Sequence, residues 1–130
     1  MVEEIRHNNQ LLAYLYDGQI PASTTFLASN DSPQQAGYIV YSKDSTIPRH
    51  YHKPVERHLH TTTEVLLVLR GTCIADIYDD AQTLITSRNL QAGNVLIVLS
   101  GGHGFRVTED LVLFEVKQGP YAGQNEKVRF

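Results

Sequence analysis

The sequence predicts an all-β domain, built as an antiparallel sandwich or a small barrel. Short runs rich in Val, Ile, Thr, Tyr and Leu recur along the chain, and Gly, Pro, Asn, Asp and Ser separate them. No long segment repeats apolar residues at helical spacing, and only residues 3–13 are expected to hold a short helix. Many short strands at regular intervals favour a sandwich or barrel. The expected strands cover residues 11–16, 24–28, 38–42, 65–69, 73–78, 83–87, 95–99 and 111–117.

The run from Val95 to Leu99 is apolar at every position. One face of such a strand has to fill the interior, and the other has to be covered by a second sheet or by another subunit. A small barrel with exposed edge strands often covers them by dimerising. We therefore expect a homodimer.

Composition limits the classes of function. The 130 residues suffice for one domain, and 42% of them are hydrophobic. The net charge of −3 and the scattered Lys and Arg argue against a nucleic-acid partner. No apolar run approaches the length of a membrane span, and the acidic N-terminus does not resemble a signal peptide. Cys73 is a lone cysteine, which predicts a small core residue and a cytoplasmic location.

Two copies of one metal-ligand spacing overlap in the middle of the chain. His50 and His52 are followed by Glu56, and His58 and His60 are followed by Glu64. Imidazoles two residues apart on an extended chain point to the same face, and a carboxylate from a neighbouring strand can complete a cluster with them. Imidazoles and carboxylates are ligands for Zn, Fe, Mn, Ni or Co.

Two further residues belong to the same hypothesis. Glu64 opens an expected strand in which Leu66 and Val68 share its parity, and these two side chains should line the interior. His103 lies in a glycine-rich segment that we interpret as a loop. Glycines let such a loop turn sharply and direct the imidazole inward.

These residues resemble the motifs of the cupins, which are small antiparallel barrels with a metal at the centre. The first cupin motif, G-x5-H-x-H-x3/4-E-x6-G, is matched in most positions by His58, His60, Glu64 and Gly71, with His52 at the leading glycine. The second motif, G-x5-P-x-G-x2-H, is matched in altered form from Gly93. Its proline is replaced by a leucine, and its histidine, His103, comes one residue early.

The whole chain is also similar to a group of small, stand-alone bacterial cupins, largely of unknown function. Their pattern combines Q-Q-x-G/A-Y, P-x-H-x-H, R, T-x-E-V-L, G, G-G-H-G-F and E-V-K-Q-G-P-Y. The matching residues here are 34–38, 48–52, Arg57, 62–66, Gly71, 101–105 and 115–121.

The resemblance implies a double-stranded β-helix, or jelly-roll, barrel in one domain of residues 1–130. Residues 1–30 would form N-terminal strands at a dimer contact, residues 31–118 the core barrel, and residues 119–130 a C-terminal tail.

In this closer resemblance His50 and His52 are the motif pair, and Asp44 takes the place of the leading cupin glycine. The implied ligands of one divalent transition metal (Zn, Fe, Mn, Ni or Co) are then His50, His52, Glu64 and His103. The overlapping register, in which His58 and His60 replace the first pair, stays open.

The substrate-facing candidates are Arg57, His58 and Phe105. Arg57 could clamp a carboxylate or phosphate, although an ion pair would explain it equally well. For Phe105, core packing is the stronger interpretation. No residue is assigned as catalytic, and Glu56 is a candidate base.

Three functions are compatible with this pattern. The first is a metal-dependent enzyme acting on a small sugar-related or carboxylate substrate. The second is a non-catalytic module that binds or senses a small molecule. The third is a metal-free structural or dimerisation domain.

Overall fold

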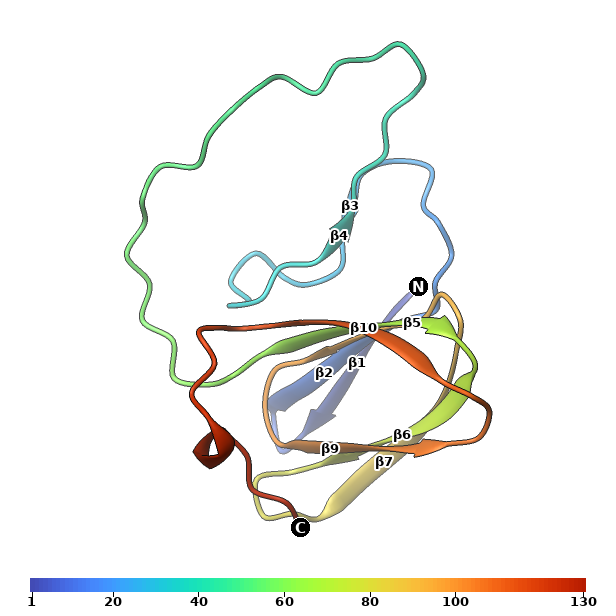
Figure 1. Ribbon diagram of the computed structural model, residues 1–130, viewed down its shortest axis with the longest axis vertical. Helices are drawn as coiled ribbons and strands as arrows, with labels where there is room; N and C mark the ends of the chain where they lie inside the picture. The colour runs from blue at the N-terminus through green and yellow to red at the C-terminus, as the bar shows by residue number, and fades with distance from the viewer.

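The computed structural model describes residues 1–130 and is all-β, with antiparallel sheets throughout (Figure 1). Its one helical element is a single 3-10 turn, η1, at Gln124–Glu126. No helix has the length and apolar character needed to cross a bilayer. The strands are β1 (Val2–His7), β2 (Gln10–Tyr16), β3 (Thr25–Phe26), β4 (Gly37–Tyr38), β5 (Glu64–Arg70), β6 (Thr72–Tyr78), β7 (Leu84–Gln91), β8 (Val95–Val98), β9 (Gly102–Val107) and β10 (Val112–Lys117).

The strands form two main sheets and one small ribbon. A five-stranded sheet has the order β1-β2-β8-β5-β10, and a three-stranded sheet has the order β7-β6-β9. Strands β3 and β4 pair only with each other. The two main sheets lie as separate layers in Figure 1, an arrangement compatible with a β-sandwich.

The expected short helix over residues 3–13 is wrong, because this segment forms the β1–β2 hairpin. The two-residue loop between the strands is Asn8-Asn9, and both residues have positive φ, 47° and 65°. Asparagine tolerates this conformation, which is required at both central positions of the tight turn that matches the twist of a hairpin. Ile5 is buried while its neighbours on either side are not, as expected for a strand with one covered face.

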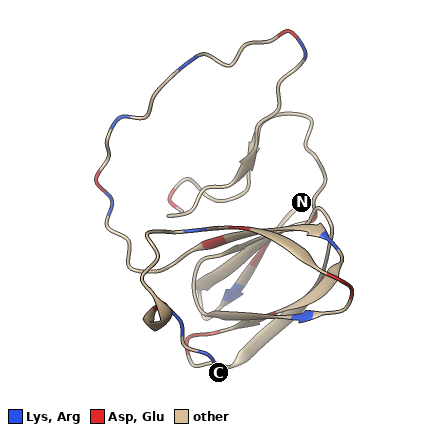
Figure 2. Ribbon diagram, in the orientation of Figure 1, with Lys and Arg blue, Asp and Glu red and all other residues tan.

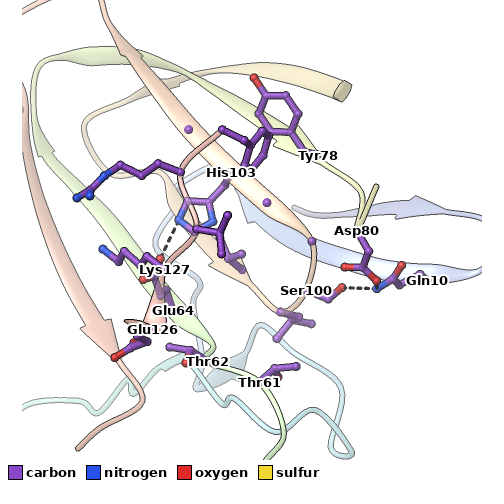
Figure 3. A pocket seen from close by; sticks show the side chains of 18 of the residues that line it. Gln10, Thr61, Thr62, Glu64, Tyr78, Asp80, Ser100, His103, Glu126 and Lys127 are labelled. Atoms are coloured by element: carbon purple, nitrogen blue, oxygen red, sulfur yellow. Dashed lines mark hydrogen bonds and ion pairs between the residues drawn. The ribbon is translucent and has the colours of Figure 1, made fainter. Parts of the chain in front are cut away.

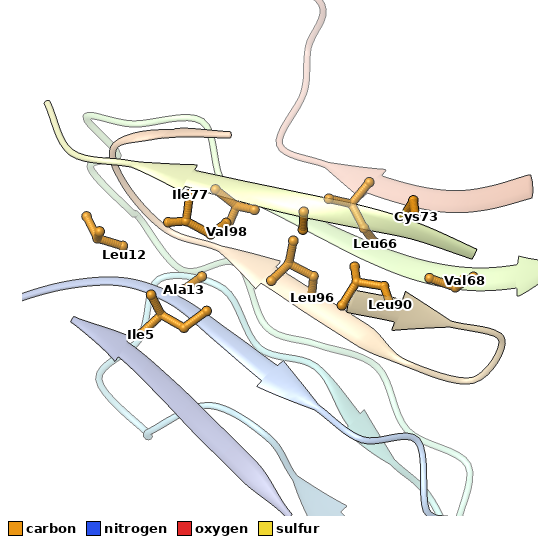
Figure 4. Close-up of a cluster of buried hydrophobic side chains, with 11 residues drawn as sticks. Ile5, Leu12, Ala13, Leu66, Val68, Cys73, Ile77, Leu90, Leu96 and Val98 are labelled. Carbon is orange, nitrogen blue, oxygen red and sulfur yellow. The ribbon is translucent and has the colours of Figure 1, made fainter. Parts of the chain in front are cut away.

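The main hydrophobic core lies between the two large sheets. Its side chains come from strands in both layers, at alternate positions in β5, β6 and β8, whereas β2 contributes the consecutive residues Leu12 and Ala13 at an irregularity in its pairing with β1 (Figure 4). Leu66 and Val68 belong to this core, which confirms the parity expected from the sequence. Cys73 is also a core residue, 1% exposed. The cluster comprises Ile5, Leu12, Ala13, Leu66, Val68, Cys73, Ala75, Ile77, Leu90, Leu96 and Val98.

Strand β8 is buried on both faces, as its uninterrupted apolar sequence predicts. Leu96 and Val98 point into the main core, whereas Val95 and Ile97 belong to a second cluster. That cluster also contains Leu27, which comes from the segment carrying the β3–β4 ribbon. The ribbon segment therefore covers part of the outer face of the five-stranded sheet.

Between the ribbon and β5 the chain forms a long exposed arm, which we define as residues 41–62. Every residue of this arm is exposed, and none lies in a strand. Figure 1 shows the arm looping away from both main sheets. Of the expected strand 38–42, only Tyr38 lies in a strand, as the last residue of β4. A loop of this length without secondary structure is uncommon and is usually functional or a linker.

Leu96→Ala should remove about 2–5 kcal/mol from the free energy of unfolding, because Leu96 is 1% exposed at the centre of the main core. Denaturant titration measures this loss. Leu84→Ala is the matched control, since Leu84 is 51% exposed and should cost far less. Equal costs for the two variants would contradict the placement of the core.

A buried carboxylate holds the three strands of the smaller sheet together. Asp76 on β6 is 7% exposed and accepts two hydrogen bonds from Arg106 on β9, from Nε at 2.7 Å and from Nη2 at 2.8 Å. The hydroxyl of Ser87 on β7 donates a further hydrogen bond to it. The Arg106 guanidinium and then the Ser87 hydroxyl lower the pKa of Asp76 to about 2.

Asp76→Asn should destabilise the fold by about 1–2 kcal/mol at pH 7, because the Arg106 guanidinium loses its anionic partner. The pKa of Asp76 lies lower in the folded protein than in the unfolded chain. Its contribution is therefore complete above about pH 4 and declines as the pH falls towards 2.

Urea unfolding at a series of pH values tests this dependence. The difference between the wild type and Asp76→Asn should shrink towards the acid end, while the exposed control Asp31→Asn stays near the wild type at every pH. A difference that is independent of pH would exclude a charged Asp76 as the cause.

Candidate functional site

The first residues of β5 and β9 bring a carboxylate and an imidazole into contact. Glu64 Oε2 lies 2.9 Å from His103 Nε2, and the dashed line in Figure 3 marks this pair. Glu64 is 6% exposed, and its backbone is flanked by Val98 on β8 and Lys117 on β10. His103 belongs to the other sheet, where it is paired with Ile77 on β6. The contact therefore joins the two layers at one end of the fold.

The segment carrying His103 is a strand rather than the loop expected from its glycines. The turn comes earlier, at Gly101, which has a φ of 71°. A Cβ atom at Gly101 would lie 2.2 Å from the backbone oxygen of Tyr78, so a larger residue would displace the chain there. The glycine thus permits the reversal between β8 and β9 that directs His103 towards Glu64.

A second carboxyl group, that of Glu115, influences the pKa of Glu64. The hydrogen bond from His103 is the largest influence on Glu64 and lowers the pKa of its carboxyl, against the opposing effect of burial. Glu115 on β10 has a raised pKa, chiefly because it shares a hydrogen bond with Glu64. Glu64 is thus the carboxylate of the pair, and Glu115 is the group that holds a proton more readily.

Glu64 and His103 line a cavity of about 850 Å³, and Glu115 lies outside its lining. Hydroxyl and amide groups line part of it, including Gln10, Thr61, Thr62 and Ser100. Gln10 donates hydrogen bonds of 3.1 Å both to Asp80 and to the Ser100 hydroxyl, which fixes the amide at the cavity wall (Figure 3). A concave site with a few convergent polar groups is the usual setting for a small-molecule ligand.

The other two predicted metal ligands lie elsewhere. His50 and His52 are exposed in the arm, with their ring centroids 5.3 Å apart, and Nδ1 of His50 lies 2.9 Å from the backbone oxygen of Pro48. The structure contains no group of three or more potential metal-ligating side chains. Of the predicted set, it brings together Glu64 and His103 and leaves the histidine pair apart.

The substrate-facing candidates are also divided between the arm and the core. Arg57 is exposed, and His58 Nε2 lies 3.4 Å from Glu56 Oε1 with both side chains largely in solvent. Phe105 packs against the main core, and its ring lies 5.9 Å from that of His103. Of the arm histidines, His60 lines the cavity.

Several residues of the cavity wall were not predicted from the sequence. Gln10 and Ser100 are single polar residues at the ends of apolar runs, where they read as ordinary strand termini. Lys127, Arg129 and Phe130 come from the C-terminal tail, which has no periodic pattern. The only signal in the tail was its alternation of basic and apolar residues.

No protein-family model, no curated protein and no solved structure matches this chain. The geometry of the site is therefore the basis for a functional proposal.

His103→Phe should raise the pKa of Glu64, because the variant keeps an aromatic ring but removes the hydrogen bond that lowers this pKa most. Carboxyl ¹³C NMR measures the titration of Glu64 directly. His58→Phe is the control, since His58 contacts only the exposed Glu56 and should leave Glu64 unchanged. An unaltered Glu64 titration in His103→Phe would rule out the contact.

Proposed function

We propose that this protein is a small metal-binding cupin in which Glu64 and His103 supply two of the ligands of one divalent transition metal. The observation that carries the proposal is their contact of 2.9 Å at the edge of a polar cavity. A carboxylate and an imidazole brought together from different sheets are a fitting half of a four-donor site for Zn, Fe, Mn, Ni or Co.

The arm is the proposed source of the other two ligands, His50 and His52. Its last residue, Thr62, is two residues before Glu64, so the arm is tethered at the site itself. An extended chain spans at most about 3.3–3.6 Å per residue, so the segment from His52 to Glu64 could span roughly 40 Å. That reach is ample for the histidines to fold back onto the site.

Edge strands offer a place for the arm. Strand β9, which carries His103, is hydrogen-bonded only to β6, and β10 is hydrogen-bonded only to β5. Free strand edges are templates for pairing with another extended segment. Pairing of the arm with these edges would cover them and would extend the two sheets into the jelly-roll barrel of a double-stranded β-helix.

Two features of the arm favour this closure. Asp44 has a φ of 66°, so the chain turns at the position where the cupin pattern has its leading glycine. The arm also carries four Lys or Arg residues against two acidic ones, within a chain of net charge −3 (Figure 2). The rest of the molecule is thus acidic, and its field attracts the arm.

A bound cation of this kind would polarise a carbonyl or carboxylate oxygen of a ligand. The chain's own groups would do the rest. Gln10, Thr61, Thr62 and Ser100 would orient hydroxyl groups of a small sugar-related or carboxylate ligand. Glu115, whose pKa is raised chiefly by its hydrogen bond with Glu64, would be the proton donor in place of Glu56.

A non-catalytic cupin that binds or senses the same ligand is the second candidate. It is favoured by the mutual engagement of Glu64 and His103, which leaves neither group free as a base in this arrangement. A metal-free structural or dimerisation domain is the third, and metal analysis separates it from the other two. The homodimer expected from the sequence remains part of the proposal.

Purified protein should carry about one divalent metal per chain, as a single four-ligand site implies. His103→Ala should lower the metal content much more than His58→Ala, because His103 contacts Glu64 and His58 does not. Elemental analysis of the variants measures this. Protein that contains no metal and takes none up on addition would overturn the metal site.

The same measurement decides between the two histidine pairs. His50→Ala and His52→Ala should each reduce the metal content if the proposed register holds. Equal losses for His58→Ala and His103→Ala, with little effect at His50, would instead support the overlapping register with His58 and His60 as ligands.

A further inference from the structure

The C-terminal tail forms one wall of the Glu64–His103 cavity. Residues 126–130 all line it. The ring of Phe130 lies against Tyr78, with centroids 5.0 Å apart and the planes at 87°. A Cβ atom at Gly102 would lie 2.8 Å from the same ring, so the absence of a side chain at that position makes room for the tail. The last residues are therefore seated on the ends of β6 and β9.

A second contact fixes the tail at its other end. Lys117 Nζ lies 3.7 Å from Glu126 Oε1 and 5.7 Å from the centroid of the Tyr121 ring. The backbone of Lys127 is extended, with φ −120° and ψ 142°. Lys127 and Arg129 both line the cavity. Figure 3 shows Lys127 beside Glu64 and His103.

The acidic side chains at the cavity have contacts of their own, whereas two of its basic side chains do not. The carboxylates already have partners, since Glu64 contacts His103, Glu126 contacts Lys117, and Asp80 accepts a hydrogen bond from Gln10. Neither Lys127 nor Arg129 forms an ion pair or a side-chain hydrogen bond, and both are exposed.

From this arrangement we infer that the tail makes the cavity a site for a small organic oxyanion, with Lys127 and Arg129 as its anchors. The ligand carries a carboxylate or a phosphate group, the two chemistries that a guanidinium and an ammonium group both recognise. The hydroxyl and amide groups of Ser100, Thr62 and Gln10 on the remaining wall suit a ligand that also bears hydroxyl groups.

The inference deepens the proposed function and rests on it in one respect, that this cavity is the ligand site. It does not require the metal. It also replaces Arg57 by Lys127 and Arg129 as the cations that meet the ligand, because Arg57 is exposed in the arm and does not line the cavity.

The test is a titration of the full-length, chelator-treated protein with succinate, with glycerol 3-phosphate and with the neutral analogue succinamide. Backbone amide NMR shifts of Gly101, Gly102 and His103 report binding at the cavity. Both anions or one of them should shift these amides, succinamide should not, and the tighter-binding anion identifies the group as a carboxylate or a phosphate.

The variants assign the anchors. Lys127→Gln with Arg129→Gln should raise the dissociation constant of the bound anion about tenfold or more, since two charge-assisted contacts are lost. Lys43→Gln with Arg70→Gln removes the same charge from exposed positions outside the cavity and should leave the constant unchanged. Both double variants replace exposed side chains, and their thermal unfolding should match the wild type.

The anion site and the metal site can be refuted independently of each other. No anion-dependent shift in the wild type, or equal affinity in the Lys127/Arg129 variant and the wild type, overturns this inference whatever the metal content. Equal weakening in both double variants would show an effect of net charge alone and would also overturn it. Anion binding in a protein that takes up no metal would leave the inference standing and end the metal proposal.

Discussion

Strand β8 has apolar side chains on both of its faces, and both faces have to be removed from water. Its neighbours β2 and β5 hold it at the centre of the five-stranded sheet. The smaller sheet then covers one face, and the segment around the β3–β4 ribbon covers the other. With β8 fixed in this way, the register of β5 against it is fixed as well, since a slip of one residue would turn Leu66 out of the core.

The candidate site follows from that register. Glu64 is paired with Val98, the last residue of β8, so it comes to lie where the chain turns through Gly101 into β9. His103 meets it from the opposite sheet. Burying a carboxylate is unfavourable unless it is hydrogen-bonded or paired, and the imidazole provides that compensation. The contact thus links the two layers.

The tail packs on this site, whereas most of the arm does not. The tail is already seated on it through Phe130 and contributes two cations that form no ion pair or side-chain hydrogen bond. The arm ends next to it but extends away from both main sheets (Figure 1), and His50 and His52 are exposed. Both segments are polar and lack a buried face, so their position depends on a few specific contacts rather than on the hydrophobic core.

Much of the fold could be predicted because strands have a recognisable pattern in the local sequence. The alternation of Glu64, Leu66 and Val68, the continuous apolar run of β8 and the small core residue Cys73 were each legible in the sequence. The Asn8-Asn9 pair is also a local turn signal. The prediction of a short helix over residues 3–13 took no account of it.

The sequence by itself determined the all-β class, many of the strands, the faces that β5 and β8 bury, and that Glu64 and His103 are candidate partners. Only the tertiary structure decided that these two meet across the sheets, that the His50 and His52 pair stays in the arm, and that Lys127 and Arg129 line the cavity. The physical reason is the distance along the sequence over which each feature is determined. Alternation and turns are set by neighbouring residues, whereas the meeting of distant polar side chains depends on how whole sheets pack, and no short pattern encodes it.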